Sequence, residues 1–208
     1  MNDVGKKKTP KCLVIDADIA RAAGGENAHD ERSKNCRDFL GAMLDHTQHK
    51  VVLTRAIQEE WNKHQSLTTL SWRATMIAQK RVCLIRAPAD DELRSKVEQC
   101  ASSENKRESM FKDIHLVEAA LQAAKIVISM DETVRQCFRE VTHKIRPLAF
   151  IAWVNPCISE ETPVDWLKNG AELERERLLG YRRASSATWR INKRPVREWE
   201  VSPKNFSL

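Results

Sequence analysis

Short β-branched apolar runs alternate with amphipathic helical patterns along most of this chain. Each run is long enough for a buried strand and too short for an ordinary helix. The five runs are Cys12–Ile15, Val51–Thr54, Val82–Ile85, Ile126–Ser129 and Leu148–Val154. Strands that alternate with helices are joined by right-handed crossovers, which predicts a parallel sheet covered by helices on both faces. The chain is therefore expected to be an α/β protein.

The helices are predicted from apolar residues that recur at helical spacing. They are expected around Cys36–Leu44, after Thr54, over Ser71–Lys80, Asp90–Cys100 and Asp113–Lys125, and after Asp131. Two segments lack this period: Arg21–Arg32 is expected to be a loop or a broken helix, and Ser102–Met110 a loop. In the helix expected at Asp113–Lys125, His115 and Glu118 belong to a polar stripe that we expect to face outward, whereas Asp113 faces inward.

Composition narrows the class of protein. The chain has 208 residues and a mean hydropathy of −0.54, and no apolar stretch approaches the roughly 20 residues that a membrane-spanning helix needs. Met1–Lys11 is polar and contains lysines, so it does not resemble a secretory signal, and we expect a cytoplasmic protein. Six scattered cysteines without a CxxC pair indicate reduced, buried side chains, and we expect neither a disulfide framework nor a zinc site.

The character of the chain changes at Cys157, which suggests a domain at 1–155 and a basic extension at 156–208. The extension is expected to contain a helix from Val164 to about Arg183. From Lys168 onward it has ten lysines and arginines against five glutamates, with Tyr181, Trp189 and Trp199 interleaved. Together with a net charge of +6, this favours a polyanionic partner. Aromatic side chains of the extension could stack on bases, although we expect the tryptophans to pack on the domain.

Four acidic residues are expected to meet at one edge of the sheet. Asp16 and Asp131 each follow a strand, and Glu60 and Asp113 each lie on the inward face near the start of a helix. Glu59 points away and replaces Glu60 only if the helix register slips by one residue. Converging carboxylates repel one another, and a hard divalent cation such as Mg²⁺ or Mn²⁺ resolves that repulsion. Such an ion activates water as the nucleophile, so a serine or cysteine nucleophile is not required.

Each of these acids also has a purely structural interpretation. Asp16 could be a turn residue, Asp113 an N-cap, and Asp131 part of a helix start at which Ser129 and Glu132 form a capping box. Asp18 is expected to cap the following helix rather than to bind metal.

Four segments in order, CLVIDAD, VVLTRAIQEEW, FKDIHLVEAAL and IVISMDET, resemble the PIN-domain nuclease family over Lys11 to about Val154. The resemblance implies a three-layer α/β/α sandwich with a central parallel sheet, and a metal-dependent enzyme that cuts RNA. It assigns Asp16, Glu60, Asp113 and Asp131 as the successive metal-binding acids and Ser129 as an auxiliary hydroxyl. Many members are toxins, so an antitoxin partner, and also a homodimer, stay open. The basic extension departs from the minimal family domain.

We therefore expect a Mg²⁺- or Mn²⁺-dependent endoribonuclease, with one or two metal ions. Its RNA-binding residues are predicted to be Lys106, Arg107, Arg182, Arg183, Arg190 and Lys193. Two alternatives stay open. One is a non-catalytic module of the same fold that binds nucleic acid or protein, and the other is a nuclease that acts on DNA.

Overall fold

A five-stranded parallel sheet forms the centre of this protein. The computed structural model describes residues 9–24, 30–86 and 89–181. The strand order is β3-β2-β1-β4-β5, and every adjacent pair is parallel. The strands are β1 (Cys12–Ile15), β2 (Lys50–Leu53), β3 (Val82–Leu84), β4 (Ile126–Ile128) and β5 (Ala152–Val154). The predicted α/β fold with a parallel sheet is confirmed.

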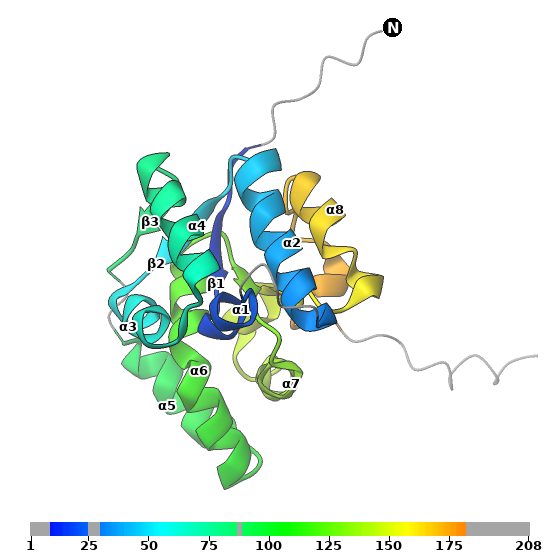
Figure 1. The fold of residues 1–208 in the computed structure, drawn as a ribbon. Helices are drawn as coiled ribbons and strands as arrows, with labels where there is room; N and C mark the ends of the chain where they lie inside the picture. Colours follow the sequence, from blue (N-terminus) through cyan, green and yellow to red (C-terminus); the bar gives the residue numbers. More distant parts are fainter. Residues whose placement is uncertain (1–8, 25–29, 87–88, 182–208) are drawn as a thin grey trace, which may run out of the picture.

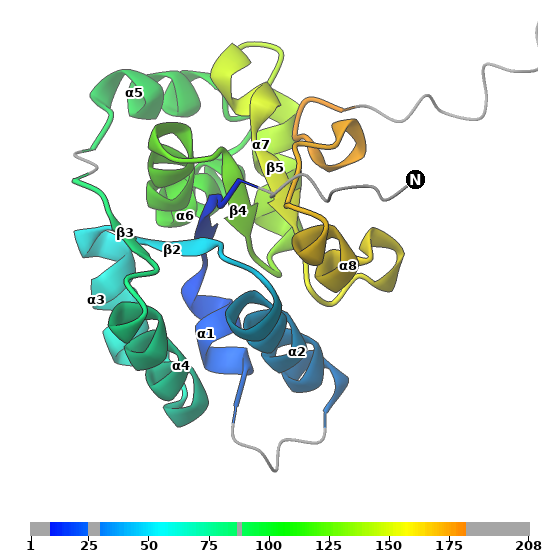
Figure 2. The ribbon, with the colours of Figure 1, turned by 90° about the horizontal axis from the view of Figure 1, so that it is seen from above.

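Helices cover both faces of the sheet. Figure 2 shows α5 and α6 on one face and α1, α2 and α4 on the other. The α-helices of the described residues are α1 (Ala17–Ala22), α2 (Glu31–His46), α3 (Arg55–His64), α4 (Leu67–Ala78), α5 (Asp91–Cys100), α6 (Glu104–Gln122), α7 (Glu132–Val141) and α8 (Pro163–Lys168). Short 3-10 helices lie at Arg146–Phe150, Ser159–Glu161 and Arg175–Arg177. None of the helices in the described ranges is long and apolar enough to cross a membrane.

The central strand is buried because both of its edges are paired and both of its faces are covered. Val14 pairs with Val52 of β2 and with Val127 of β4. Trp61 and Trp153 are fully buried in the core. The indole of Trp61 donates a hydrogen bond to the carbonyl oxygen of Ile15 at 3.1 Å, so α3 is held against the end of β1.

Helix α6 begins nine residues earlier than expected. The predicted loop at Ser102–Met110 is wrong, because α6 starts at Glu104 and Ser103 accepts a hydrogen bond from the amide of Lys106 as its N-cap. Its first two turns are polar and show no apolar period, since they lie largely at the surface. Asp113 is therefore in the middle of a helix, and the interpretation of Asp113 as an N-cap is also wrong.

The polar stripe expected to face outward on α6 is partly covered by α5. Glu118 is 5% exposed. Its carboxylate accepts hydrogen bonds from the guanidinium of Arg94, at 2.7 and 2.9 Å, and from the amide of Asp90. A buried charge is tolerated when it is paired and hydrogen-bonded in this way. His115 is also largely covered, with 11% of its side chain exposed.

Two further elements are shorter than predicted. Pro147 lies in a 3-10 helix at Arg146–Phe150, and the fifth strand is only Ala152–Val154. The helix expected from Val164 to Arg183 ends at Lys168, because Gly170 and Ala171 have positive φ angles of 107° and 50°. The Arg21–Arg32 segment contains the last turn of α1 and the start of α2, with residues 25–29 outside the described ranges.

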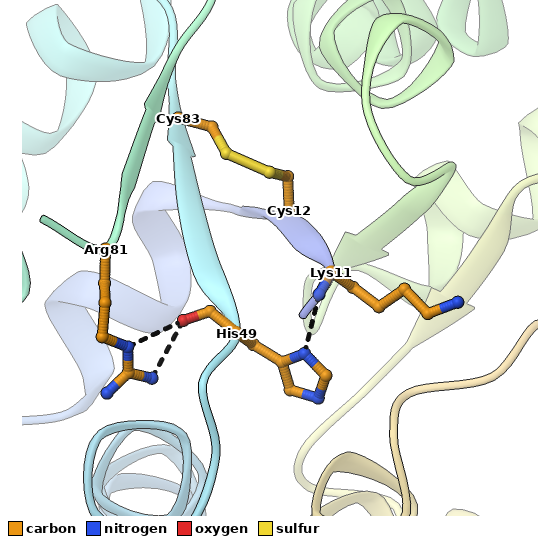
Figure 3. Close-up of a disulfide and its surroundings, with 5 residues drawn as sticks. All are labelled: Lys11, Cys12, His49, Arg81 and Cys83. Atoms are coloured by element: carbon orange, nitrogen blue, oxygen red, sulfur yellow. Dashed lines mark hydrogen bonds between the residues drawn. A yellow bond between two sulfur atoms is a disulfide. The ribbon is translucent and has the colours of Figure 1, made fainter. Parts of the chain in front are cut away.

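A disulfide corrects the expectation that the cysteines are reduced. Cys12 of β1 and Cys83 of β3 are bonded, with Cα atoms 6.4 Å apart, and β2 lies between their strands (Figure 3). At the same end of the sheet, Arg81 donates two hydrogen bonds to the carbonyl oxygen of His49. The Lys11 amide donates to Nδ1 of His49, and burial lowers the pKa of this imidazole. The first three strands are thus cross-linked covalently and by hydrogen bonds.

The described part of the 156–208 extension packs against the rest of the protein. Helix α8 contacts α2, and Nε2 of His49 lies 3.1 Å from the carbonyl oxygen of Leu167. Leu179 is fully buried, and its amide donates to the carbonyl oxygen of Ile151. Residues 182–208 lie outside the described ranges, and with them Trp189 and Trp199.

Candidate active site

The strand order places a crevice at the carboxyl ends of β1 and β4. From β1 the chain adds β2 and β3 on one side, and it then crosses over to add β4 and β5 on the other. In open parallel sheets, ligands bind beside the carboxyl ends of the strands at the point where the strand order reverses. Asp16 follows β1 directly, and Ser129 and Asp131 follow β4. The topology therefore brings residues from distant parts of the chain to the crevice.

A cavity of about 650 Å³ opens at this point. All four predicted acids line it, together with Asp18 and Glu132. Five exposed basic residues also line it: Arg21, Arg32, Lys63, His64 and Lys112. None of these five forms an ion pair with an acid of the cavity in the described part of the chain. The cavity thus combines buried carboxylates with a positively charged rim.

Ser129 connects the two acids that follow the central strands. Its buried hydroxyl donates a 2.8 Å hydrogen bond to Oδ2 of Asp16 and accepts one from the amide of Asp131 at 3.1 Å. Asp16 is the N-cap of α1, where Oδ1 accepts from the amide of Asp18. Asp131 is the N-cap of α7, where Oδ1 accepts from the amide of Val134 at 2.8 Å. These bonds hold both carboxylates in place at the mouth of the crevice.

Asp113 enters the cavity from the middle of α6. Its side chain is 8% exposed and makes no hydrogen bond or ion pair with any described residue. Burial, and then the negative charge of Asp16, raise the pKa of Asp113 to about 7, and Asp131 and Glu60 contribute in the same direction. The charges of three other carboxylates act on the pKa of Asp113 only if those carboxylates lie near it. This effect, and the cavity that all four acids line, support the predicted convergence of the four acids.

Glu60 is the member of the Glu59–Glu60 pair that reaches the cavity. Its Oε2 lies 3.2 Å from Nε2 of His115 on α6. Glu59 is exposed and pairs with Arg55 at 2.8 Å. The predicted register of this helix is therefore correct. His64 shares a helical phase with Ile57, which predicts a packed or hydrogen-bonded side chain, but it is exposed at the rim of the cavity.

Asp18 has a different position from the one predicted. It does not cap the following helix, because that cap is Asp16. Its Oδ2 accepts a hydrogen bond from the amide of Met130 at 3.1 Å, while its buried Oδ1 has no partner among the described residues. Burial and the charge of Asp16 raise the pKa of Asp18 to about 7. Asp18 is thus a fifth acid of the site, and the DxD spacing of Asp16 and Asp18 was the signal for it.

The structural interpretations of Asp16 and Asp131 are correct in part, because both side chains are helix N-caps. The capping box proposed for Ser129 and Glu132 is wrong. The hydroxyl of Ser129 accepts a hydrogen bond from the amide of Asp131, and the carboxylate of Glu132 accepts hydrogen bonds from the side chains of Asn155 and Arg135. An N-cap uses one carboxylate oxygen, so this role leaves the other oxygen of Asp131 for a ligand.

Of the predicted RNA-binding residues, the two in the described part of the chain do not line the cavity. Lys106 pairs with Glu140 at 2.6 Å, and Arg107 pairs with Glu98 and Glu104. Arg182, Arg183, Arg190 and Lys193 lie outside the described residues. The basic residues at the rim were missed, since an isolated Arg21 or Lys63 in a sequence has no pattern that indicates a site.

The four predicted acids offer the kind of ligand that Mg²⁺ and Mn²⁺ prefer, because they supply carboxylate oxygens that no lysine or arginine of the described residues pairs with. Among the described residues, however, no three His, Cys, Asp or Glu side chains are grouped closely enough to hold a metal ion as they stand. The carboxylates share a cavity and an electrostatic field without forming a closed ligand shell.

Asp113→Asn is expected to stabilise the protein at neutral and higher pH. The unfolded chain loses this proton near pH 4, whereas the folded protein retains it up to about pH 7. Ionisation in that interval therefore favours the unfolded state, and stability falls as pH rises from about 4 to about 7. We expect a gain of about 1–2 kcal/mol at pH 8, or roughly 2–8 °C in Tm, after allowance for solvent screening in the open cavity.

Thermal melts of wild type and Asp113→Asn at pH 5 and pH 8, without divalent cations, check this. The exposed Asp38→Asn variant on α2 is the control. A difference in Tm that does not grow with pH contradicts the assignment.

The chain was compared with models of known protein families and with curated proteins, and neither comparison gave a match.

Proposed function

We propose that this protein is a metal-dependent ribonuclease with a PIN-like, three-layer α/β/α domain. The observation that supports it most directly is the cavity at the point where the strand order reverses. There, Asp16, Glu60, Asp113 and Asp131 line one cavity beneath a rim of exposed basic residues, and in the described part of the chain none of them is paired with a lysine or arginine. Buried acids alone would suit a cation and a basic rim alone would suit an anion. A phosphodiester hydrolysed with a divalent ion needs both.

In this proposal the four acids hold Mg²⁺ or Mn²⁺. A bound divalent ion would supply Lewis acidity: it lowers the pKa of a water molecule and neutralises charge on the scissile phosphate. Ser129 is a positioning residue, because its hydrogen bonds fix Asp16 and orient the start of α7. Arg21, Lys63 and Lys112 attract the phosphates on either side of the scissile bond.

The first experiment is incubation of the protein with structured and unstructured RNA, with Mn²⁺ or with EDTA, and with single-stranded DNA in parallel. Cleavage of RNA that requires Mn²⁺ supports the proposal. Cleavage of DNA alone would favour the DNA nuclease. Salt-dependent binding without cleavage, unaffected by Mn²⁺, would favour the non-catalytic binding module. The absence of a closed ligand shell in the described residues lends weight to that alternative.

Neighbouring glutamates provide a matched pair of variants. Glu60→Gln is expected to lower the Mn²⁺-dependent cleavage rate by at least about 10–100-fold, because even the loss of an outer-shell partner of a metal costs that much. Glu59→Gln, one residue away on the outward face, is expected to cleave as wild type does. Initial rates on one fluorescent RNA substrate compare the two. Equal losses in both variants would show that the register assigned to the site is wrong.

The resemblance to the PIN-domain family also suggests an antitoxin partner and a homodimer, and both stay proposals. Co-expression and size-exclusion chromatography with light scattering test them.

A further inference from the structure

Three sulfur atoms from distant parts of the chain meet beside the acidic cavity. They belong to Cys36 of α2, Met130 after β4 and Cys157 after β5. Sγ of Cys36 lies 3.5 Å, and Sγ of Cys157 3.6 Å, from Sδ of Met130. Each thiol donates its hydrogen to this thioether sulfur. Neither cysteine is part of a disulfide.

These separations suit three ligands of one ion. A metal–sulfur bond is about 2.3 Å long, so three sulfurs in a trigonal plane around an ion lie about 4 Å apart. The two measured separations differ from that value by a few tenths of an ångström. Two thiols and a thioether are soft ligands, and soft thiolate and thioether sulfur selects Cu(I) over the hard divalent ions.

The neighbouring charges also suit a monovalent ion. Binding releases the two thiol protons to solvent, and the resulting two thiolates with one monovalent cation have a net charge of −1. The guanidinium of Arg32 can offset that charge, because its Nε lies 3.2 Å from Sδ of Met130. The backbone carbonyl oxygen of the same residue accepts a weak hydrogen bond from the thiol of Cys157. Zinc fits less well, because tetrahedral Zn²⁺ sites take four ligands. No group of three or more His, Cys, Asp and Glu side chains in the described ranges could supply them.

We propose that Cys36, Met130 and Cys157 form a binding site for a soft monovalent cation of the Cu(I) class. The site is partly accessible, since Cys157 and Met130 are half-buried whereas Cys36 is fully buried. It is distinct from the proposed hydrolytic site in its ligands and in the ion that it prefers. Its existence does not depend on the ribonuclease proposal.

The test is an anaerobic titration with Cu(I), kept reduced by ascorbate and buffered by a chromogenic chelator, so that the Cys12–Cys83 disulfide is retained. Wild type is expected to bind one equivalent. Cys157→Ser, at a half-buried position, and Cys36→Ser are expected to bind Cu(I) at least about 100-fold more weakly. That loss exceeds the usual effect of removing an outer-shell partner of a metal. Met130→Leu is expected to weaken Cu(I) binding by about 10-fold.

Cys100→Ser and Cys137→Ser are the matched controls, because both are free cysteines outside the cluster, and both should bind as wild type does. X-ray absorption of the loaded protein should show three sulfur ligands in wild type and two in Met130→Leu. Wild-type affinity in Cys157→Ser, or a tighter complex with Zn²⁺ than with Cu(I), would overturn the proposal. Folding of each variant is checked by circular dichroism.

Discussion

Asp16→Asn should reduce Mn²⁺-dependent RNA cleavage by more than about 100-fold, beyond the loss typical of an outer-shell change at a metal site. Asp16 directly follows β1 at the switch point of the sheet, and after burial its charge is the next largest cause of the raised pKa values of Asp18 and Asp113. Removing this charge takes away one of the proposed ligands of the divalent ion and part of the field that favours a cation. The fold should be retained, since asparagine is also a good N-cap: its carbonyl oxygen can accept the hydrogen bond from the amide of Asp18, and its NH2 group, in the place of Oδ2, can donate to the hydroxyl of Ser129.

The same variant should also melt at a higher temperature than wild type in the absence of metal, because one of several repelling charges is gone. Mn²⁺ should raise the Tm of wild type and leave that of Asp16→Asn unchanged. Rates on one RNA substrate and melts with Mn²⁺ or EDTA measure both effects, with Asp38→Asn as the control. Undiminished cleavage by Asp16→Asn would reject the assignment of the site.

Loss of the Cys12–Cys83 disulfide should lower the free energy of unfolding by about 2–4 kcal/mol, or roughly 4–16 °C in Tm. The bond closes a loop across a sequence separation of 71, and it links two strands that are not hydrogen-bonded to each other. Opening it increases the conformational freedom of the unfolded chain more than that of the folded sheet.

Melts with and without a phosphine reductant compare wild type with Cys12→Ala/Cys83→Ala. Reductant should lower the Tm of wild type and have little effect on the double variant, while Cys100→Ala should behave as wild type. If reductant leaves the Tm of wild type unchanged, the cross-link does not stabilise this fold.

The parallel sheet could be predicted because each strand is a short apolar run, and all but the edge strand β3 are largely buried between the covering helices. The acids could be located because an Asp after such a run lies at the ligand-binding edge. Glu60 could be separated from Glu59 by helical phase alone. These features depend on local spacing, which a sequence displays directly.

The features that were missed depend on contacts between distant residues. The first turns of α6 have no apolar face, so no period marks the helix before Met110. Glu118 looks like a surface residue until Arg94 of α5 is placed against it. Cys12 and Cys83 pair across an intervening strand, and Cys36, Met130 and Cys157 meet only after β1, β4 and β5 are assembled. None of these pairings follows from the order of residues along the chain.

The place of β1 in the sheet has a consequence for the protein as it is synthesised. This strand is synthesised before the other four described strands, yet it needs β2 on one edge and β4, more than a hundred residues later, on the other. Until Ile126–Ile128 has emerged, a nascent chain exposes an apolar strand edge of the kind that recruits chaperones or aggregates. It also lacks Asp131. A chain that stops before Asp131 therefore cannot assemble the cavity, and under the ribonuclease proposal it could not cleave RNA before β4 has been synthesised.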